Sequence, residues 1–356
     1  MVNRTAQPGR LPASNQALEL HRRGPVVDML VGSVLFRDSF VGGRRGHVDL
    51  PRLRASNVNV VGLTVATRFP DLRGTLSRWH FRSLGAPRSA LSTNMALAEW
   101  LIERIEGWCR VSGGELAIVR DAADLERCLA GGGPVGVLLG VQGGHVLDGE
   151  LANVDRLRQL GVRTHAPAHV MDNELVGSGT GRRAGGLTDY GRQVIAELEA
   201  QSIIVDLAHM SVAGISAVLP QLRRPFMLSH TGLTEVAGSQ SRWRRYSPAT
   251  RNVAASLAAE VGAAGGLVGI MLASQLLGGD SLADAVRTIR LALNFAGESQ
   301  VAIGSDMDGA LRTIIDAEGL PALTDALLTS GLAEPVVTGV IGGNAARFLA
   351  RALTAG

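Results

Sequence analysis

Five polar side chains stand where short apolar runs of this sequence end, and their types are those that ligate metals or move protons. Two of them, His209 and His230, end the runs SIIVDLAH and PFMLSH. Imidazole nitrogens are common zinc ligands, so these two side chains could hold a single Zn²⁺ if their runs lie side by side. A hydrogen-bonded pair of histidines is the alternative. The other three are Gln142, His169 and Asp306.

Asp306 lies in the segment GSDMDG, where glycines on either side let the chain turn sharply. A carboxylate held there could act as a general acid or base. Its alternative role is to cap the turn from strand to helix, and we expect Asp308 to be such a cap.

The position of Gln142 limits how many metal ions the site could hold. A carboxylate there would bridge two ions, whereas a neutral amide is a weak oxygen ligand and bridges poorly. The first apolar run ends at Leu30 and Gly32 without an HxD or HxH pair. The triplet His47-Val48-Asp49 does spell HxD, but it runs into a turn and helix, and we expect it outside any metal centre.

Eight apolar or β-branched runs, each followed by a helical pattern, must position these side chains. Helical periodicity covers 190–200, 252–264 and 281–295. Strands that are apolar throughout and alternate with helices favour a parallel sheet, and eight such units favour a single-domain (β/α)8, TIM-type barrel with its chemistry at the carboxyl ends of the strands. A doubly wound sheet is the alternative, but the first run lacks the glycine fingerprint that it needs. The predicted strands are 25–30, 58–65, 135–141, 162–169, 202–209, 225–230, 266–272 and 300–306.

The chain divides into a polar N-terminal arm, residues 1–24, and a barrel, residues 25–356. A long helical connection at about 66–134 carries expected helices near 95–109 and 122–129. The glycine-rich stretch 177–186 has the composition of a phosphate loop, but no strand leads directly into it. We expect a mobile connection that ends at Thr188, the N-cap of a helix.

Composition excludes several classes of chemistry. All 35 basic residues are arginines, so Schiff-base catalysis, a P-loop lysine and a carbamylated lysine bridging two metals are ruled out. The net charge of +3 is too small for a broad cationic face, and we expect no nucleic-acid partner. Arg242, Arg244 and Arg245 with Trp243 form one local cluster, which we interpret as a solvated loop or an internal anion clamp.

Two cysteines, Cys109 and Cys128, are too few for a disulfide framework in a chain of 356 residues. The sequence shows no signal peptide and no apolar run of membrane-spanning length, so we expect a cytoplasmic protein without a membrane partner. Exclusive use of arginine with abundant alanine and glycine suggests a GC-rich bacterial genome.

Several long segments resemble the membrane (renal) dipeptidase family, zinc metallopeptidases with an amidohydrolase-like (β/α)8 barrel. The resemblance runs from about residue 25 to residue 349. Its specific pieces are GHVDLPRLRAS, LGVQGGHVLDGELANVDRLRQLGVR, GLTDYGRQVIAELEAQSIIVDLAH, RRPFMLSHT, ATRNV, VAIGSDMDG and GGNAARFL.

The resemblance implies a degenerate metal centre. The HxD pair of the family aligns with Leu30 and Gly32, and its bridging glutamate aligns with Gln142. The two histidines of the second metal are kept as His209 and His230. Three of the five usual ligands are therefore replaced, so one Zn²⁺ at most is expected.

The resemblance also implies roles for three other residues. His169 corresponds to the histidine that contacts substrate, Arg251 to the arginine that engages the substrate carboxylate, and Asp306 to the aspartate that handles protons at the scissile amide. A homodimer is expected because members of the family commonly dimerise.

The first hypothesis is a dipeptidase-like hydrolase that acts on a dipeptide or similar small amide with a free carboxylate, using at most one metal ion. Asp306 would be its general base and then its acid. One alternative is a metal-free barrel that performs tailoring, isomerase or lyase chemistry on an amino-acid-derived metabolite. The other is a non-catalytic binding protein.

Overall fold

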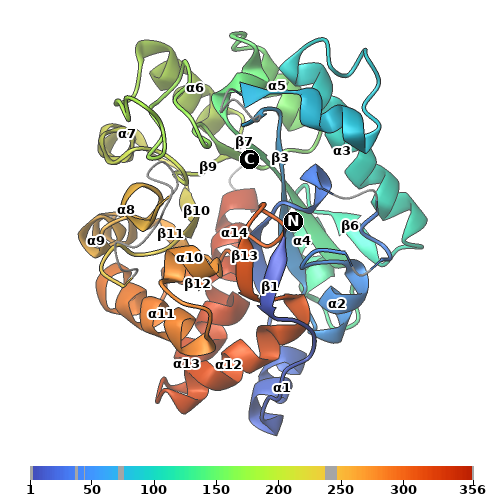
Figure 1. Cartoon of the computed structure of the whole chain (residues 1–356), viewed down its shortest axis with the longest axis vertical. Coiled ribbons are helices and arrows are strands. Elements are labelled where there is room, and N and C mark those ends of the chain that lie inside the picture. Colours follow the sequence, from blue (N-terminus) through green and yellow to red (C-terminus); the bar gives the residue numbers. More distant parts are fainter. Residues whose placement is uncertain (1–2, 37–38, 44, 71–75, 237–246, 355–356) are drawn as a thin grey trace.

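A computed structural model describes residues 3–36, 39–43, 45–70, 76–236 and 247–354, and its centre is a ring of parallel strands. The strands pair in the order β10-β11-β12-β2-β3-β7-β8-β9, and a parallel bridge between Asp206 and Met227 joins the two ends of this path. The sheet therefore closes into the expected (β/α)8 barrel (Figure 1). The strands are β2 (Val27–Val31), β3 (Val60–Ala66), β7 (Val135–Gln142), β8 (Thr164–Ala166), β9 (Ile204–Val205), β10 (Met227–Thr231), β11 (Leu267–Ile270) and β12 (Val301–Ile303).

Each of the eight predicted runs overlaps one of these strands, and four of the strands end one residue later than predicted. The runs form strands because their valine and leucine side chains are buried on both faces; all eight residues of β7, for example, are buried. Glycines permit the tightest approaches. A Cβ at Gly269 or Gly304 would lie 1.9 Å or 1.8 Å from the carbonyl oxygen of Ser229, so only glycine allows these neighbouring strands to pass so close to β10.

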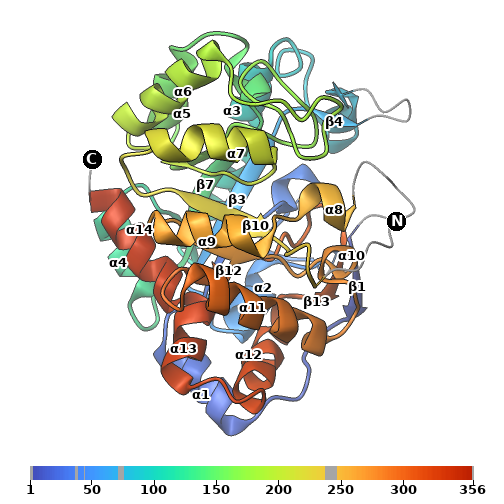
Figure 2. The same ribbon diagram turned by 90° about the vertical axis from the view of Figure 1, so that its left-hand side faces the viewer.

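Helices surround the strands (Figures 1 and 2). The predicted helix 122–129 is found with those bounds, and Thr188 is the N-cap of α6, where its hydroxyl accepts from the N–H of Gly191. The expected helix 252–264 begins later, at Ala255. The helices are α2 (Leu50–Ala55), α3 (Asn94–Val111), α4 (Ala122–Leu129), α5 (Asn153–Gln159), α6 (Asp189–Ala200), α7 (Val212–Val218), α8 (Pro248–Arg251), α9 (Ala255–Ala263), α10 (Ser274–Leu277), α11 (Leu282–Ala296), α12 (Leu320–Thr329), α13 (Glu334–Thr338) and α14 (Asn344–Thr354).

The N-terminal arm packs on the barrel. Its strand β1 (Arg4–Gln7) pairs in parallel with β13 (Arg312–Ile315), and Figure 2 shows the two together. Its helix α1 (Asn15–Arg23) buries His21, whose Nδ1 lies 2.8 Å from the carbonyl oxygen of Ser56 and whose Nε2 lies 2.7 Å from the hydroxyl of Thr324. The division into an arm, 1–24, and a barrel, 25–356, stays our proposal, with the arm docked by these contacts.

The long connection after β3 carries α3 and α4 together with β6 (Leu116–Ile118), which pairs with β7. It also carries the short antiparallel pair β4 (Phe69–Pro70) and β5 (Leu76–Ser77). The arginine cluster at 242–245 lies outside the described residues. None of the described helices combines the length and the apolar character that crossing a membrane requires.

The glycine-rich stretch 177–186 differs from the expected mobile connection. A Cβ at Gly177 would lie 2.2 Å from the backbone nitrogen of Gly185, and one at Gly179 would lie 2.4 Å from the carbonyl oxygen of Thr250. The N–H of Gly179 also donates to the carbonyl of His209, at 2.9 Å. The stretch is therefore a packed loop, and its glycines allow backbones to approach closely.

Candidate active site

The carboxyl ends of the strands bring four of the predicted residues together. The Nε2 atoms of His209 and His230 are 3.1 Å apart, and the Nε2 of Gln142 lies 3.4 Å from that of His230. The ring centroids of His169 and His209 are 4.8 Å apart. Gln142, His209 and His230 are each less than 10% exposed, so the cluster is buried at the mouth of the barrel.

The sequence predicted His169 and His209 as the last residues of their strands, but in the structure both lie beyond the strand ends. β8 ends at Ala166 because Pro167 has no N–H to continue the ladder, and β9 ends at Val205. His209 then adopts a left-handed backbone, with φ of 64°, and Asp306 does the same after β12, with φ of 57°. Such conformations are uncommon outside glycine and gather at functional sites.

A buried carboxylate, Asp206, determines through Ser229 which ring nitrogen of His230 carries the proton. Asp206 accepts from the N–H groups of Ala208 and Ser229 and, at 2.5 Å, from the Ser229 hydroxyl. Since that hydroxyl has only one proton, its oxygen accepts from Nδ1–H of His230, 2.7 Å away. The Nε2 atom of His230 is therefore left with its lone pair facing His209.

The same arrangement recurs behind Asp306. Asp28 accepts from the N–H groups of Leu30 and Ser305 and from the Ser305 hydroxyl. In both copies an aspartate in or just after one strand holds a serine in or just after the neighbouring strand, and a predicted site residue follows that serine. Neither aspartate is among the predicted site residues, although VDML with GSD and VDLA with LSH form a repeated pattern in the sequence.

Asp306 has a strongly perturbed acidity. Burial raises its pKa to about 7, the charge of Arg251 opposes the rise, and the charge of Asp28 adds to it. Burial likewise raises the pKa of Asp28 to about 6, against hydrogen bonds from Ser305 and Leu30 that favour the ionised form. Two buried carboxyls that influence each other near neutral pH are typical of acid and base chemistry.

Arg251 is a buried cation at the centre of the site. It ends α8, is 4% exposed, and donates from Nη2 to the carbonyl of His230 at 3.0 Å. No carboxylate of the described residues pairs with it within 4.0 Å, and its Nε has no hydrogen-bond partner. Burial and the charge of Arg251 lower the pKa values of His209 and His230 well below the ordinary value, so both are neutral at pH 7.

The two histidine Nε2 atoms have a separation that two ligands of one metal ion could have. Two nitrogens of a tetrahedral zinc site, with bonds of about 2.0–2.1 Å, lie roughly 3.3 Å apart, close to the separation of the histidine Nε2 atoms. Within the described residues, however, no group of three or more His, Cys, Asp and Glu side chains is placed to hold an ion. Gln142 directs its amide nitrogen at His230, so its amide oxygen could serve as a third donor once the amide group turned over.

The resemblance predicts that Leu30 and Gly32 stand where the family has the two ligands of its first metal, and this alignment stays a prediction. Leu30 is buried, and the N–H of Gly32 donates to the carbonyl of Met307 at 2.8 Å. A Cβ at Gly32 would lie only 2.9 Å from the carbonyl oxygen of Asp308.

Asp308 does not cap the turn as expected. Its carboxylate accepts instead from the hydroxyl of Ser33 and the N–H of His47. Asp49 caps α2 by accepting from the N–H of Arg52, and Nδ1 of His47 accepts from the N–H of Asp308 at 2.9 Å. That the HVD triplet lies outside any metal centre stays a prediction.

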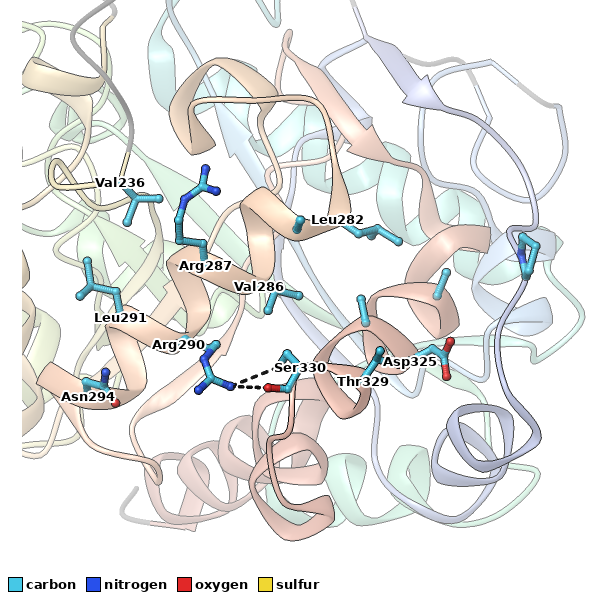
Figure 3. Close-up of a pocket in the computed structure, with 14 residues that line it drawn as sticks. Val236, Leu282, Val286, Arg287, Arg290, Leu291, Asn294, Asp325, Thr329 and Ser330 are labelled. Carbon is cyan, nitrogen blue, oxygen red and sulfur yellow. Dashed lines mark hydrogen bonds between the residues drawn. The ribbon is translucent and has the colours of Figure 1, made fainter.

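Two cavities help to place the site. One of about 210 Å³ is bordered by His209, Arg251 and Asn252, each of which has a buried polar atom without a hydrogen-bond partner among the described residues. A larger groove of about 720 Å³ lies between α11 and α12, away from the strand ends (Figure 3). There Arg290 donates to Ser330, and no histidine lines the groove, so it lacks the chemistry of the barrel mouth.

Comparison with known proteins agrees with this architecture. The membrane dipeptidase model of peptidase family M19 matches residues 14–355. Dipeptidase aclJ of Aspergillus oryzae is 31% identical over 227 residues, 61% of this chain and 51% of that protein. Dipeptidase 3 of Macaca fascicularis is 27% identical over 331 residues, 86% of this chain and 64% of that protein. The chain thus spans about half to two thirds of the length of these two curated relatives.

One solved structure shows the likeness in fold. It is a metallopeptidase from Rhodobacter sphaeroides, bound to a phosphinate mimic of the dipeptide L-Ala-D-Ala. It is 24% identical to this chain, with a TM-score of 0.76, and the match covers 92% of this chain and 99% of that one.

Proposed function

Because the chain belongs to the membrane dipeptidase family, peptidase family M19, we propose that it hydrolyses a dipeptide, or a similar small amide, that carries a free carboxylate. The observation that best supports this proposal is Arg251, a buried guanidinium without a carboxylate partner among the described residues. A buried charge without a counter-ion is costly, so this position favours a ligand that brings its own anion. The carboxylate of the substrate is this anion: it binds Arg251, and His169 lies beside it.

Asp306 handles the protons of the reaction. With a pKa of about 7, it is partly ionised at neutral pH and can accept a proton from the attacking water. The water oxygen bonds to the amide carbon, and Asp306 then gives the proton to the nitrogen of the leaving amine as the carbon–nitrogen bond breaks. Burial keeps bulk water away from this exchange.

His209 and His230 are the residues that would hold a metal ion, with weak support from Gln142. A bound zinc ion would supply Lewis acidity and lower the pKa of water. Asp206 and Ser229 keep Nε2 of His230 free of a proton, which is the state that a ligand needs. The residues present suit at most one ion.

A dipeptide panel and a metal analysis on one preparation, purified without chelator, test this proposal. We expect turnover of dipeptides with a free carboxyl group, little turnover of the same dipeptides as C-terminal amides, and no more than one equivalent of zinc. Asp306→Asn should abolish turnover, whereas Asp325→Asn, in the groove of Figure 3, should leave it unchanged.

Two outcomes would contradict the proposal. Two equivalents of metal would overturn the single-ion site. Folded protein that hydrolyses none of the dipeptides would overturn the hydrolase, and would leave metal-free acid and base chemistry or simple ligand binding to explain the site. The cytoplasmic location and the homodimer stay predictions.

A further inference from the structure

A third cavity, of about 590 Å³, opens beside the candidate active site and is lined by polar residues and one glycine. Ligand cavities are usually mainly apolar, so this one suits a ligand that carries its own charges. The charged and titratable groups come from the loops after β3, β7 and β8; they are Arg68, His145, Asp148, Asp172, Glu174 and Arg183.

His145 connects this cavity to the site. A Cβ at Gly143 would lie 3.5 Å from the Cβ of His169 and 3.7 Å from the Cδ2 of His145, so the two histidines flank the same residue. The loop that carries Asp172 is also tied to His169, because Ser178 donates its hydroxyl to the His169 carbonyl and its N–H to Asp172. A ligand that extends past His169 therefore enters the cavity.

Two of its three carboxylates already hold the backbone in place. Asp148 accepts from the N–H groups of Asn94 and Met95 at the start of α3. Asp172 accepts from the N–H of Arg183, at 2.8 Å, as well as from Ser178. Because the oxygens of Asp148 and Asp172 already accept these backbone hydrogen bonds, neither carboxylate is the best candidate to bind a ligand.

Glu174 is the one carboxylate of the three that is not held by the backbone N–H of another described residue, and it lies with two guanidinium groups beside the charges of Asp148 and Asp172. Glu174 has a side chain that is 39% exposed, and its Oε2 lies 3.6 Å from Nδ1 of His145. Arg68 donates from Nε to Asn94, and its terminal nitrogens have no hydrogen-bond partner among the described residues. The side chain of Arg183 has no ion pair among the described residues. A carboxylate and two guanidinium groups that can still bind a ligand complement a group with an ammonium and a carboxylate.

We infer that this cavity receives an amino-acid head group at the acyl end of the substrate. Arg68 and Arg183 bind its carboxylate, and Glu174 binds its ammonium group. The preferred substrate is then an amide with a free carboxylate on the amine side, held by Arg251, and an α-amino acid head group on the acyl side, as in a γ-glutamyl dipeptide. This inference rests on the proposed function for the site of cleavage.

Four amides with one scissile bond and one C-terminal alanine test the two contacts separately. γ-L-Glutamyl-L-alanine has both groups, glutaryl-L-alanine lacks the ammonium, 4-aminobutyryl-L-alanine lacks the carboxylate, and butyryl-L-alanine lacks both. Partly exposed ion pairs contribute about 0.2–1 kcal/mol each, so we expect each group to raise kcat/KM by up to roughly fivefold.

Variants assign each contact to a residue. Arg183→Ala should lower kcat/KM only for the two probes with the distal carboxylate, and Glu174→Gln only for the two with the ammonium. Arg182→Ala is the matched control, because it is the neighbouring exposed arginine and does not line the cavity. Equal kcat/KM for all four probes, or equal losses in Arg182→Ala and Arg183→Ala, would overturn the inference.

Calorimetric binding to Asp306→Asn protein separates this inference from the proposed function. If wild-type protein hydrolyses no probe, but the variant binds γ-L-glutamyl-L-alanine more tightly than butyryl-L-alanine and loses that preference with Arg183→Ala, the head-group subsite stands and the hydrolase fails. If the probes are hydrolysed but bind equally, the hydrolase stands and the subsite is overturned.

Discussion

Asp306→Asn should stabilise the folded protein at pH 8 while it removes hydrolysis. Burial, with a further contribution from the charge of Asp28, raises the pKa of Asp306 from 3.8 to about 7, despite the opposing charge of Arg251. The folded state thus binds this proton more tightly than the unfolded state, so the free energy of unfolding falls as the pH rises from about 4 to about 7. A shift of roughly 3 pH units corresponds to about 4 kcal/mol lost at pH 8. Asparagine does not ionise and avoids that loss.

Thermal unfolding of the wild-type protein and the variant between pH 8 and pH 5 measures this effect. With an unfolding entropy of roughly 2.1 cal/mol/K per residue, 4 kcal/mol is about 5 °C in Tm for a chain of this length. The advantage of the variant should shrink to about 2 kcal/mol at pH 5, and kcat/KM of the wild-type protein should rise through about pH 7 as Asp306 ionises. A variant less stable than wild type at pH 8, with Asp325→Asn unchanged as control, would refute the reasoning.

Three further substitutions probe the rest of the site. Ser229→Ala removes the hydroxyl between a buried carboxylate and an imidazole, and should cost about 2 kcal/mol in thermal unfolding, which Ser229→Thr should partly restore. Gln142→Glu places a carboxylate beside the two imidazoles and should raise zinc occupancy in metal analysis; unchanged occupancy would argue against this placement. Gly32→Asp should destabilise by roughly 1–3 kcal/mol, because its Cβ meets the Asp308 carbonyl oxygen. A second equivalent of zinc in the triple variant Leu30→His, Gly32→Asp, Gln142→Glu would contradict that steric account.

The sequence predicts the barrel and the histidine cluster because both follow from local patterns. Runs buried on both faces indicate parallel strands, and parallel strands in a barrel carry their last residues to one mouth. His209 and His230 could therefore be placed together before their distance was known. The turns between strand and site are less predictable: Pro167 ends β8 early, and the left-handed backbone at His209 depends on the loop that packs against it.

The supporting aspartates could not be assigned from local pattern alone. Asp206 and Ser229 are separated by 23 residues, and Asp28 and Ser305 by 277, so their hydrogen bonds exist only once the barrel has closed. The role of Asp308 has the same origin, since its partners Ser33 and His47 lie more than 250 residues earlier in the chain. Residues that act through long-range hydrogen bonds are therefore hard to recognise in the sequence, where only a weak repeated pattern marks them.

The loop after β12 connects the end of β2 to Asp306. A Cβ at Gly32 would meet the Asp308 carbonyl oxygen of this loop, and the N–H of Gly32 donates to the Met307 carbonyl. The N–H of Asp306 in turn donates to the carbonyl of Leu30. Because the resemblance aligns the two ligands of the first metal with Leu30 and Gly32, we propose that these backbone contacts occupy that metal position and also hold Asp306 in place. Restoring a ligand at position 32 would then displace the loop that positions the proton-transfer group, so we propose that the first metal and the present placement of Asp306 exclude each other.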